Sequence, residues 1–251
     1  MRLSALRSLT HVREKGKEGA TPRLTNKGDD GARPRGNDGY NARGKELGAI
    51  ESTMSVPKIL VFAGSIRTGS FNARLAALAA KELALAGADV TAISLEDYPL
   101  PIYDGDDEAK SGAPANAKSL KAMMAAHQGV FIASPEYNAS VTPLLKNTID
   151  WISRVRERGE PPLAVFKQRV FALGGASDSP YGALRSLMAL RQILELGCGA
   201  LVLPEQITVF HGSEAFDEMD NLKDERTAAT LKRVAQRLTD EARQMSWREK
   251  A

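Results

Sequence analysis

A polar segment near the front of the folded part carries groups that could bind a phosphate. Three hydroxyl side chains and one guanidinium lie within six residues: Ser65, Arg67, Thr68 and Ser70. A short aliphatic run precedes the segment and a helical pattern follows it, so it would lead into the first turn of a helix. Free N–H groups and the positive dipole end favour an anion at such a turn. The segment therefore predicts a phosphate site, with Arg67 as its charged donor.

The same segment limits which phosphate it could bind. Gly64 and Gly69 have the spacing of an ATP-type loop, but Ser70 stands where that loop requires a lysine. The dinucleotide pattern is also absent, because Ser65 and Ile66 leave no second glycine close to the first. A monophosphate fits best. The alternative is an ordinary polar turn in which Ser70 caps the following helix.

A second unusual segment follows the third aliphatic run. An ordinary turn that caps the next helix would account for Pro135, Asn138 and Pro143. It would not account for Glu136 and Tyr137 at the edge of a sheet. A tight turn of this composition could supply the flat apolar contact and the backbone donors that an isoalloxazine ring needs.

The elements expected around these segments alternate in the manner of βαβ units, which indicates a parallel sheet. The predicted strands cover residues 59–63, 90–95, 130–133, 170–173 and 200–203, the last one stopped by Pro204. The predicted helices cover residues 71–86, 115–128, 142–155, 181–196 and 222–245, and residues 96–114 are expected to form a long loop. The pattern predicts an α/β protein with a three-layer α/β/α sandwich. In such sheets ligands bind at the carboxyl ends of the strands, where both unusual segments lie.

Composition restricts the remaining classes of function. Residues 1–53 carry 11 Lys/Arg and 7 Asp/Glu with almost no aliphatic run, so we expect a disordered basic N-terminal extension before a folded domain at 54–251. The folded part has 23 basic and 24 acidic residues, which removes the main argument for a nucleic-acid partner. A flexible tail and a start codon assigned ahead of Met54 both remain open, while seven acidic residues disfavour a transit peptide.

A membrane span, a disulfide framework and a metal site are each disfavoured by the sequence. No run approaches the ~20 apolar residues of a membrane span, so no membrane partner is expected. The single Cys198 allows no disulfide framework and suits a reducing cytoplasm, and we read it as a small core residue. The histidines, His11, His127 and His211, are too scattered to predict a metal site.

Together the two segments resemble the NADPH-dependent FMN reductase family, including its quinone-, chromate- and azo-dye-reducing members. The resemblance covers about residues 57–206 and is carried by two motifs: Gly64-Ser65-x-Arg67-x-x-Ser70-x-Asn72 and Pro135-Glu136-Tyr137-Asn138-x-Ser140-x-x-Pro143-x-Leu145-Lys146-Asn147-x-Ile149-Asp150-Trp151. It implies a flavodoxin-like fold with five parallel strands in the order 2-1-3-4-5. It also implies bound FMN, NADPH or NADH as co-substrate, and a homodimer or homotetramer.

The resemblance assigns cofactor-binding roles by position. It places the FMN phosphate on four side chains and one backbone contact: Ser65, Arg67, Ser70 and Asn72, with Phe71. It places the flavin ring on a second group: Pro135, Glu136, Tyr137, Asn138 and Ser177. No side chain is expected to be catalytic. The chain departs from the family at Gly182-Ala183, where two glycines are common, and this puts the contacts on the substrate side in doubt.

The activity implied is a reductase that takes hydride from NAD(P)H onto FMN and passes two electrons to a small acceptor. Quinones, azo compounds, chromate and free flavin are the candidate acceptors. The alternative is a flavodoxin-type electron carrier without NAD(P)H oxidation. Such carriers usually have a threonine-rich phosphate loop and a strongly acidic surface, so Arg67 and the near-neutral folded part favour the reductase.

Overall fold

The computed structural model describes residues 55–248, and side chains up to residue 245. The predicted N-terminal extension and His11 lie outside the described residues. The strands are β1 Lys58–Ala63, β2 Asp89–Ile93, β3 Gly129–Ala133, β4 Val170–Ala176 and β5 Leu201–Val209. The helices are α2 Phe71–Leu85, α3 Gly105–Ser111, α4 Ala115–Ala125, α5 Pro143–Arg154, α6 Ala164–Lys167, α7 Leu184–Arg191, α8 Gly212–Ala215 and α9 Glu225–Arg248, with a 3-10 turn η1 Leu95–Asp97 and a π-helical segment η2 Gln192–Gly197.

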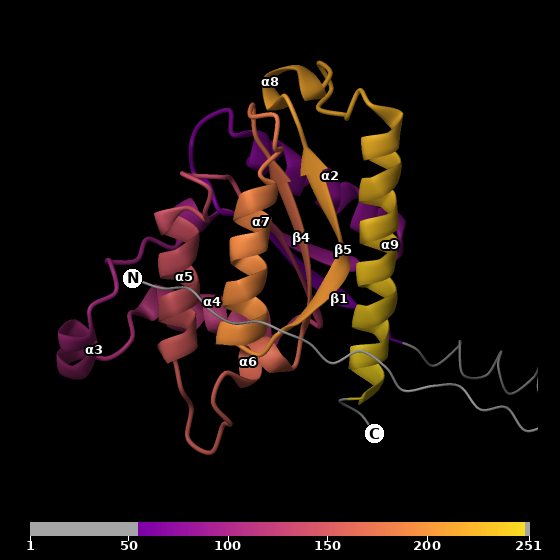
Figure 1. Cartoon of the computed structure of the whole chain (residues 1–251). Coiled ribbons are helices and arrows are strands. Elements are labelled where there is room, and N and C mark those ends of the chain that lie inside the picture. The colour runs from indigo at the N-terminus through magenta and orange to yellow at the C-terminus, as the bar shows by residue number, and fades with distance from the viewer. Residues whose placement is uncertain (1–54, 249–251) are drawn as a thin grey trace, which may run out of the picture. The chain divides into compact units, whose positions relative to one another are not determined.

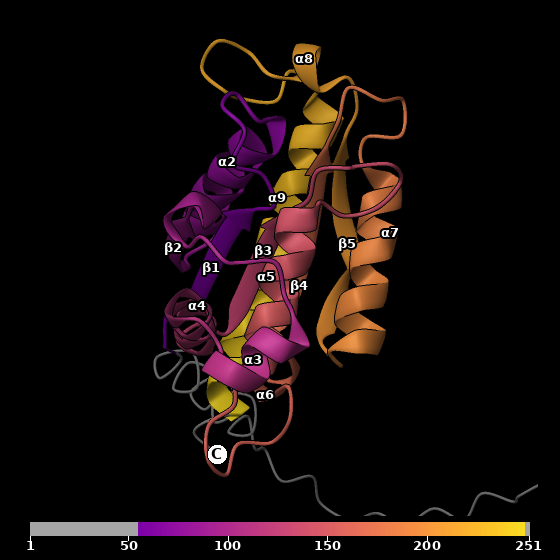
Figure 2. The same cartoon turned by 90° about the vertical axis from the view of Figure 1, so that its left-hand side faces the viewer.

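The five strands form one parallel sheet in the order β2-β1-β3-β4-β5, which confirms the predicted fold. Figure 1 shows β4 beside β5, and Figure 2 shows β1 between β2 and β3. The chain thus leaves β1 for β2 on one side and then returns to place β3 on the other side of β1. This reversal makes the carboxyl ends of β1 and β3 the topological switch point. A ligand is expected in the crevice there.

Alternate residues of the strands point into two separate cores. Ile59 and Val61 of β1 pack with α2 and α9, whereas Leu60 and Phe62 pack with α4, α5 and α7. Figure 2 shows α2 and α9 on one side of the sheet and α5 and α7 on the other. The near-continuous apolar sequence of β1 follows from this arrangement, because a central parallel strand is buried on both faces. The three-layer sandwich is therefore confirmed.

Strand β5 corrects the prediction that Pro204 ends the last strand. The strand continues to Val209, and the register between Phe171 and Leu173 of β4 shifts opposite Pro204. Proline is tolerated at the bulge of an edge strand because no ladder hydrogen bond is needed there. The guanidinium of Arg191 donates to the carbonyls of Leu203 and Pro204, so the irregular stretch is satisfied from α7.

The long loop predicted at residues 96–114 is also only partly correct. It contains η1 and the short helix α3, which begins after Asp104, whose carboxylate accepts from Asp106 N at 2.8 Å. Strand β2 ends at Ile93, two residues earlier than expected, and β4 extends three residues further, to Ala176. Among the described residues, no helix combines the length and the apolar content needed to cross a membrane.

Candidate cofactor site

Three loops meet at the carboxyl edge of the sheet. The N–H of Gly64 donates to Ala133 O at 2.8 Å, and the N–H of Ser134 donates to Gly174 O at 2.7 Å. The hydroxyl of Thr142, the N-cap of α5, donates to Gly64 O at 2.7 Å. The loops after β1, β3 and β4 therefore lie side by side at the switch point. The two segments selected from sequence are brought together, and Thr142 joins them.

The loop after β1 presents the amino-terminal end of α2. Ser70 is the N-cap, as predicted, and its buried hydroxyl accepts from Ala73 N at 3.4 Å. Six other backbone N–H groups of the loop have no hydrogen-bond partner among the described residues: those of Ser65, Ile66, Thr68, Gly69, Phe71 and Asn72. Unpaired donors at a helix amino terminus form an anion site.

Arg67 lies at the mouth of this loop with its side chain exposed. Its guanidinium donates to Thr68 O at 3.4 Å and Gly69 O at 3.3 Å, and it lies 5.6 Å from the centre of the Phe71 ring. Ser65 lies at the base of the loop, where its hydroxyl accepts from Arg67 N at 3.3 Å. Both carbonyl contacts of Arg67 are long, so the guanidinium retains donors for a phosphate.

Asn72 has a different position from the other predicted phosphate contacts. Its buried carboxamide donates to Ala176 O at 2.8 Å and accepts from Ala176 N at 2.9 Å. The side chain thus ties the first turn of α2 to the last residue of β4. The contact of Asn72 with a cofactor stays a prediction.

The loop after β3 contains a tight turn at the point predicted to hold the ring. Tyr137 and Ser140 exchange backbone hydrogen bonds of 2.9 and 3.0 Å, and Asn138 and Ala139 both have positive φ, 50° and 64°. Left-handed backbone is tolerated by Asn but costs energy at Ala, on the order of 1–3 kcal/mol. Such strain is common where a loop is held for a ligand. The Tyr137 ring is 53% exposed beside this turn.

Glu136 holds that loop in place through α7. Its side chain is only 4% exposed and is bound to the guanidinium of Arg185, with Arg185 Nε at 2.7 Å. Its other oxygen accepts from the backbone N–H groups of Arg185 and Ser186 at 3.0 and 3.3 Å, so Glu136 caps α7. The hydroxyl of Ser186 donates to Pro135 O at 2.7 Å. The Glu136 side chain therefore positions the loop.

Arg185, Ser186 and Thr142 are site residues that the sequence analysis missed. Arg185 lies 49 residues from Glu136, and a charge pair at that distance along the chain leaves no pattern in the sequence. The one available signal was Thr142 before Pro143, the arrangement of a helix N-cap.

Ser177 opens the loop after β4. Its N–H donates to Val209 O at 3.1 Å and its hydroxyl accepts from Ser179 N at 3.2 Å. The next residue, Asp178, accepts from Ser213 N at 2.7 Å. The Ser213 hydrogen bonds lower the pKa of Asp178, and the positive charge of Arg67 lowers it further. The hydrogen bonds between Asn72 and Ala176 hold the loop after β4 beside the start of α2.

Ala183, at the position where the family commonly has glycine, adopts a strained backbone conformation. Ala183 has φ 65° and is fully buried, although this conformation favours glycine. It packs against Gly175, where a Cβ would come within 2.8 Å of the Ala183 Cβ and 2.9 Å of Ser134 O. Gly175 must therefore remain glycine for the loops after β3 and β4 to approach each other.

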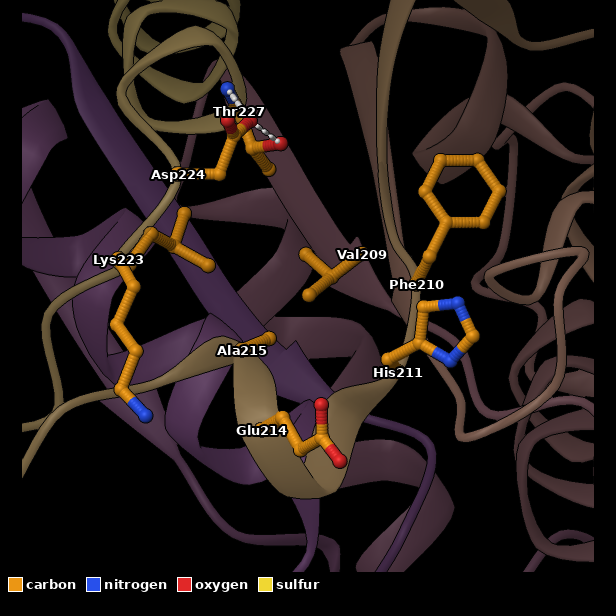
Figure 3. A pocket seen from close by; sticks show the side chains of 9 residues that line it. Val209, Phe210, His211, Glu214, Ala215, Lys223, Asp224 and Thr227 are labelled. Atoms are coloured by element: carbon orange, nitrogen blue, oxygen red, sulfur yellow. Dashed lines mark hydrogen bonds between the residues drawn. The ribbon is translucent and has the colours of Figure 1, made fainter.

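A pocket of about 310 Å³ lies beside the site, between the end of β5, α8 and the start of α9. Figure 3 shows Phe210 and His211 on one side of it and Lys223 and Asp224 on the other. Gly212, in α8, packs against the first residue of α2, because a Cβ there would lie 2.6 Å from the Phe71 ring. The pocket therefore neighbours the amino-terminal end of α2.

These groups fit a singly phosphorylated flavin. Unpaired N–H groups and the Arg67 guanidinium suit the phosphate, and a fixed turn with an exposed tyrosine suits a flat ring. The fold is that of a flavodoxin-like α/β protein, and the loop after β1 suits a monophosphate.

The model of the family described as NADPH-dependent FMN reductase matches residues 57–214. The chain therefore belongs to the NADPH-dependent FMN reductase family, as its two motifs predicted. It is an oxidoreductase, with FMN as its cofactor and NAD(P)H as its reductant.

Individual relatives agree with this membership. A quinone reductase of Escherichia coli is 36% identical over 140 residues, which cover 55% of this chain and 69% of the relative. An NAD(P)H-dependent FMN reductase of Pseudomonas aeruginosa is 31% identical over 186 residues, covering 72% and 92%. Among solved structures, a flavoenzyme NAD(P)H:(acceptor) oxidoreductase from Paracoccus denitrificans is 27% identical, with a TM-score of 0.62 and coverage of 75% and 98%.

Proposed function

We propose that this chain reduces quinones with electrons from NAD(P)H. The observation that carries the proposal is the row of unpaired N–H groups in the loop after β1, which lies directly beside the strained turn after β3. Relatives from Escherichia coli and Burkholderia that are named as quinone and 2-hydroxy-1,4-benzoquinone reductases support quinones as the acceptor. Azo compounds, chromate and free flavin are the other acceptors to be tested.

The residues divide into two groups by what they would do. Arg67 and the backbone of the loop after β1 would bind the phosphate, with Ser65 and Ser70 shaping the loop. The turn at Tyr137 and Asn138 would support the ring. FMN, when bound, supplies the chemistry by accepting hydride and releasing two electrons. The protein orients it, and no side chain of the site is assigned a proton-transfer role.

Purified protein loaded with FMN tests the proposal. We expect steady oxidation of NADPH or NADH that depends on an added benzoquinone or naphthoquinone. Parallel assays with an azo dye, chromate and free FMN would rank the acceptors. If one of these compounds is reduced faster than every quinone, that compound replaces quinones as the proposed acceptor. If the protein oxidises neither NADPH nor NADH, the reductase function is refuted.

We also propose a homodimer or homotetramer, working in the reducing cytoplasm. Leu184 and Met188 are 40% and 63% exposed, and their spacing of four residues places them on one face of α7. Tyr181, which is 52% exposed, lies in the turn before this helix. An exposed apolar stripe of this kind supports a subunit contact. The buried thiol of Cys198 supports a reducing compartment. Light scattering after size-exclusion chromatography would give the subunit number, and a monomer would contradict the assembly.

A further inference from the structure

A separate pocket of about 410 Å³ lies along α5, on the side that faces η2 and the segment before α6. Its volume lies within the range of small-molecule sites, roughly 300–1,000 Å³. None of the residues that line it was assigned to the cofactor site. Six of them carry the argument: Lys146, Ile149, Arg154, Arg156, Leu163 and Ile193.

The charges around this pocket are unbalanced. Three basic residues line it against one acidic residue, Asp150. Asp150 is paired with Lys146 at 2.7 Å, and Arg154 is paired with Glu108 at 2.8 Å. Arg156 has neither a hydrogen bond nor an ion pair among residues 55–248. The positive charge of Arg156 lowers the pKa of Glu108, which is paired with Arg154, but the N–H donors of Arg156 are unpaired among these residues. A guanidinium with unpaired donors binds carboxylate and phosphate groups well.

The backbone around the pocket is irregular on two sides. One wall includes the π-helical segment η2, and π-helical turns occur frequently at functional sites. The opposite wall includes Leu163, which has φ 61° and ψ 21° although it is not glycine. Strained backbone of this kind clusters at ligand sites. Leu163 and η2 are separated by 28 residues in the sequence, and both line this pocket.

The remaining lining is mainly apolar, apart from Ser153, whose hydroxyl donates to Asp150 O. Ile149 is buried, and Leu163 and Ile193 are half-buried. Cys198 also lines the pocket, but burial raises the pKa of its thiol to about 11, with a smaller contribution from Asp150. The thiol is therefore neutral at physiological pH and not a nucleophile. These features suit recognition of a ligand and not a reaction on it.

We propose that this pocket binds a small organic anion, whose carboxylate, sulfonate or phosphate group meets Arg156 and whose aromatic or branched body lies against Ile149, Leu163 and Ile193. The site is independent of FMN and of the reductase reaction. It adds a binding function to the chain that the cofactor site does not provide.

Isothermal titration calorimetry with 8-anilinonaphthalene-1-sulfonate tests this site, because that probe is an anion with an aromatic body. The full chain is first saturated with FMN, which blocks the cofactor site if FMN binds there. We expect saturable binding of one probe per chain. Arg156→Gln should weaken it about ten- to a hundredfold, the value of one charge-assisted hydrogen bond.

Two controls distinguish binding of the probe in this pocket from its nonspecific attraction to the protein surface. Arg158 is exposed in the same segment but does not line the pocket, so Arg158→Gln should leave binding unchanged. The uncharged N-phenyl-1-naphthylamine should bind at least about tenfold more weakly than the sulfonate. Absence of saturable binding, equal losses in both Arg variants, or equal binding of the neutral compound would each overturn the proposal. The outcome does not depend on quinone reduction, so the two proposals fail separately.

Discussion

Glu136→Gln perturbs the contact by which the loop after β3 is fixed to α7. The carboxylate accepts two hydrogen bonds from the Arg185 guanidinium and two from backbone N–H groups at the start of the helix. A glutamine of the same shape keeps one oxygen acceptor. Its NH₂ group would then face either the guanidinium or the helix N–H groups, and both of these are donors.

The expected loss follows from these contacts. A hydrogen bond to a charged group contributes about 1.5–3 kcal/mol net, and contributions within one cluster are not additive. Half of the contacts are lost, and the side chain is 4% exposed, so water replaces little of them. The Arg185 side chain is 45% exposed, so water screens its ion pair with Glu136 and reduces the contribution of that pair to stability. We therefore expect Glu136→Gln to lower the free energy of unfolding by about 2 kcal/mol.

Urea unfolding of the chain at neutral pH measures this loss. The matched control is Glu195→Gln, which removes a glutamate that pairs with Arg191 on the same helical stretch but is 41% exposed. That control should change the free energy of unfolding by less than about 0.5 kcal/mol. Equal losses in the two variants would refute the view that Glu136 holds α7 and the loop together.

Two further predictions concern buried polar contacts away from Glu136. Asn72→Ala leaves both backbone groups of Ala176 unpaired, so it should lower the free energy of unfolding by about 2–4 kcal/mol in urea, against less than about 1 kcal/mol for Asn116→Ala. Equal losses in the two variants would contradict the view that the Asn72 side chain stabilises the fold through its two hydrogen bonds to Ala176. The Lys121 ion pair lowers the pKa of Glu160, so it stabilises the fold above the unfolded pKa near 4.5, and this stabilisation is lost as the pH falls through the folded pKa. Unfolding measured from pH 3 to 6 should therefore show a shallower slope in Glu160→Gln, and an unchanged slope would refute the coupling.

Much of the fold could be predicted because hydrophobic patterns record burial. The continuous apolar run of β1 reflects a strand covered on both faces, and Ser70 before a helical pattern marks an N-cap. The end of β5 could not be predicted, because the proline rule applies to central strands and β5 is an edge strand. Helix α3 buries no residue, so it has no apolar period to detect.

The candidate site was predictable only at the level of its loops. Residue types identified the segments after β1 and β3, and sheet topology brings the carboxyl ends of neighbouring strands together. The partners of individual side chains were not predictable, because Asn72 and Glu136 bind residues 104 and 49 positions away. Contacts of such separation depend on packing that no local pattern encodes. The cofactor roles of the predicted residues remain predictions.

The central claim is that the loop after β1 binds the phosphate of FMN. Comparing the affinities of FMN and riboflavin tests it directly, because the two ligands differ only in that phosphate. The account predicts that the wild-type chain prefers FMN and that Arg67→Ala weakens FMN about ten- to a hundredfold while riboflavin binding is unchanged. Equal affinities for the two ligands in the wild-type chain, or equal losses of both in Arg67→Ala, would contradict it.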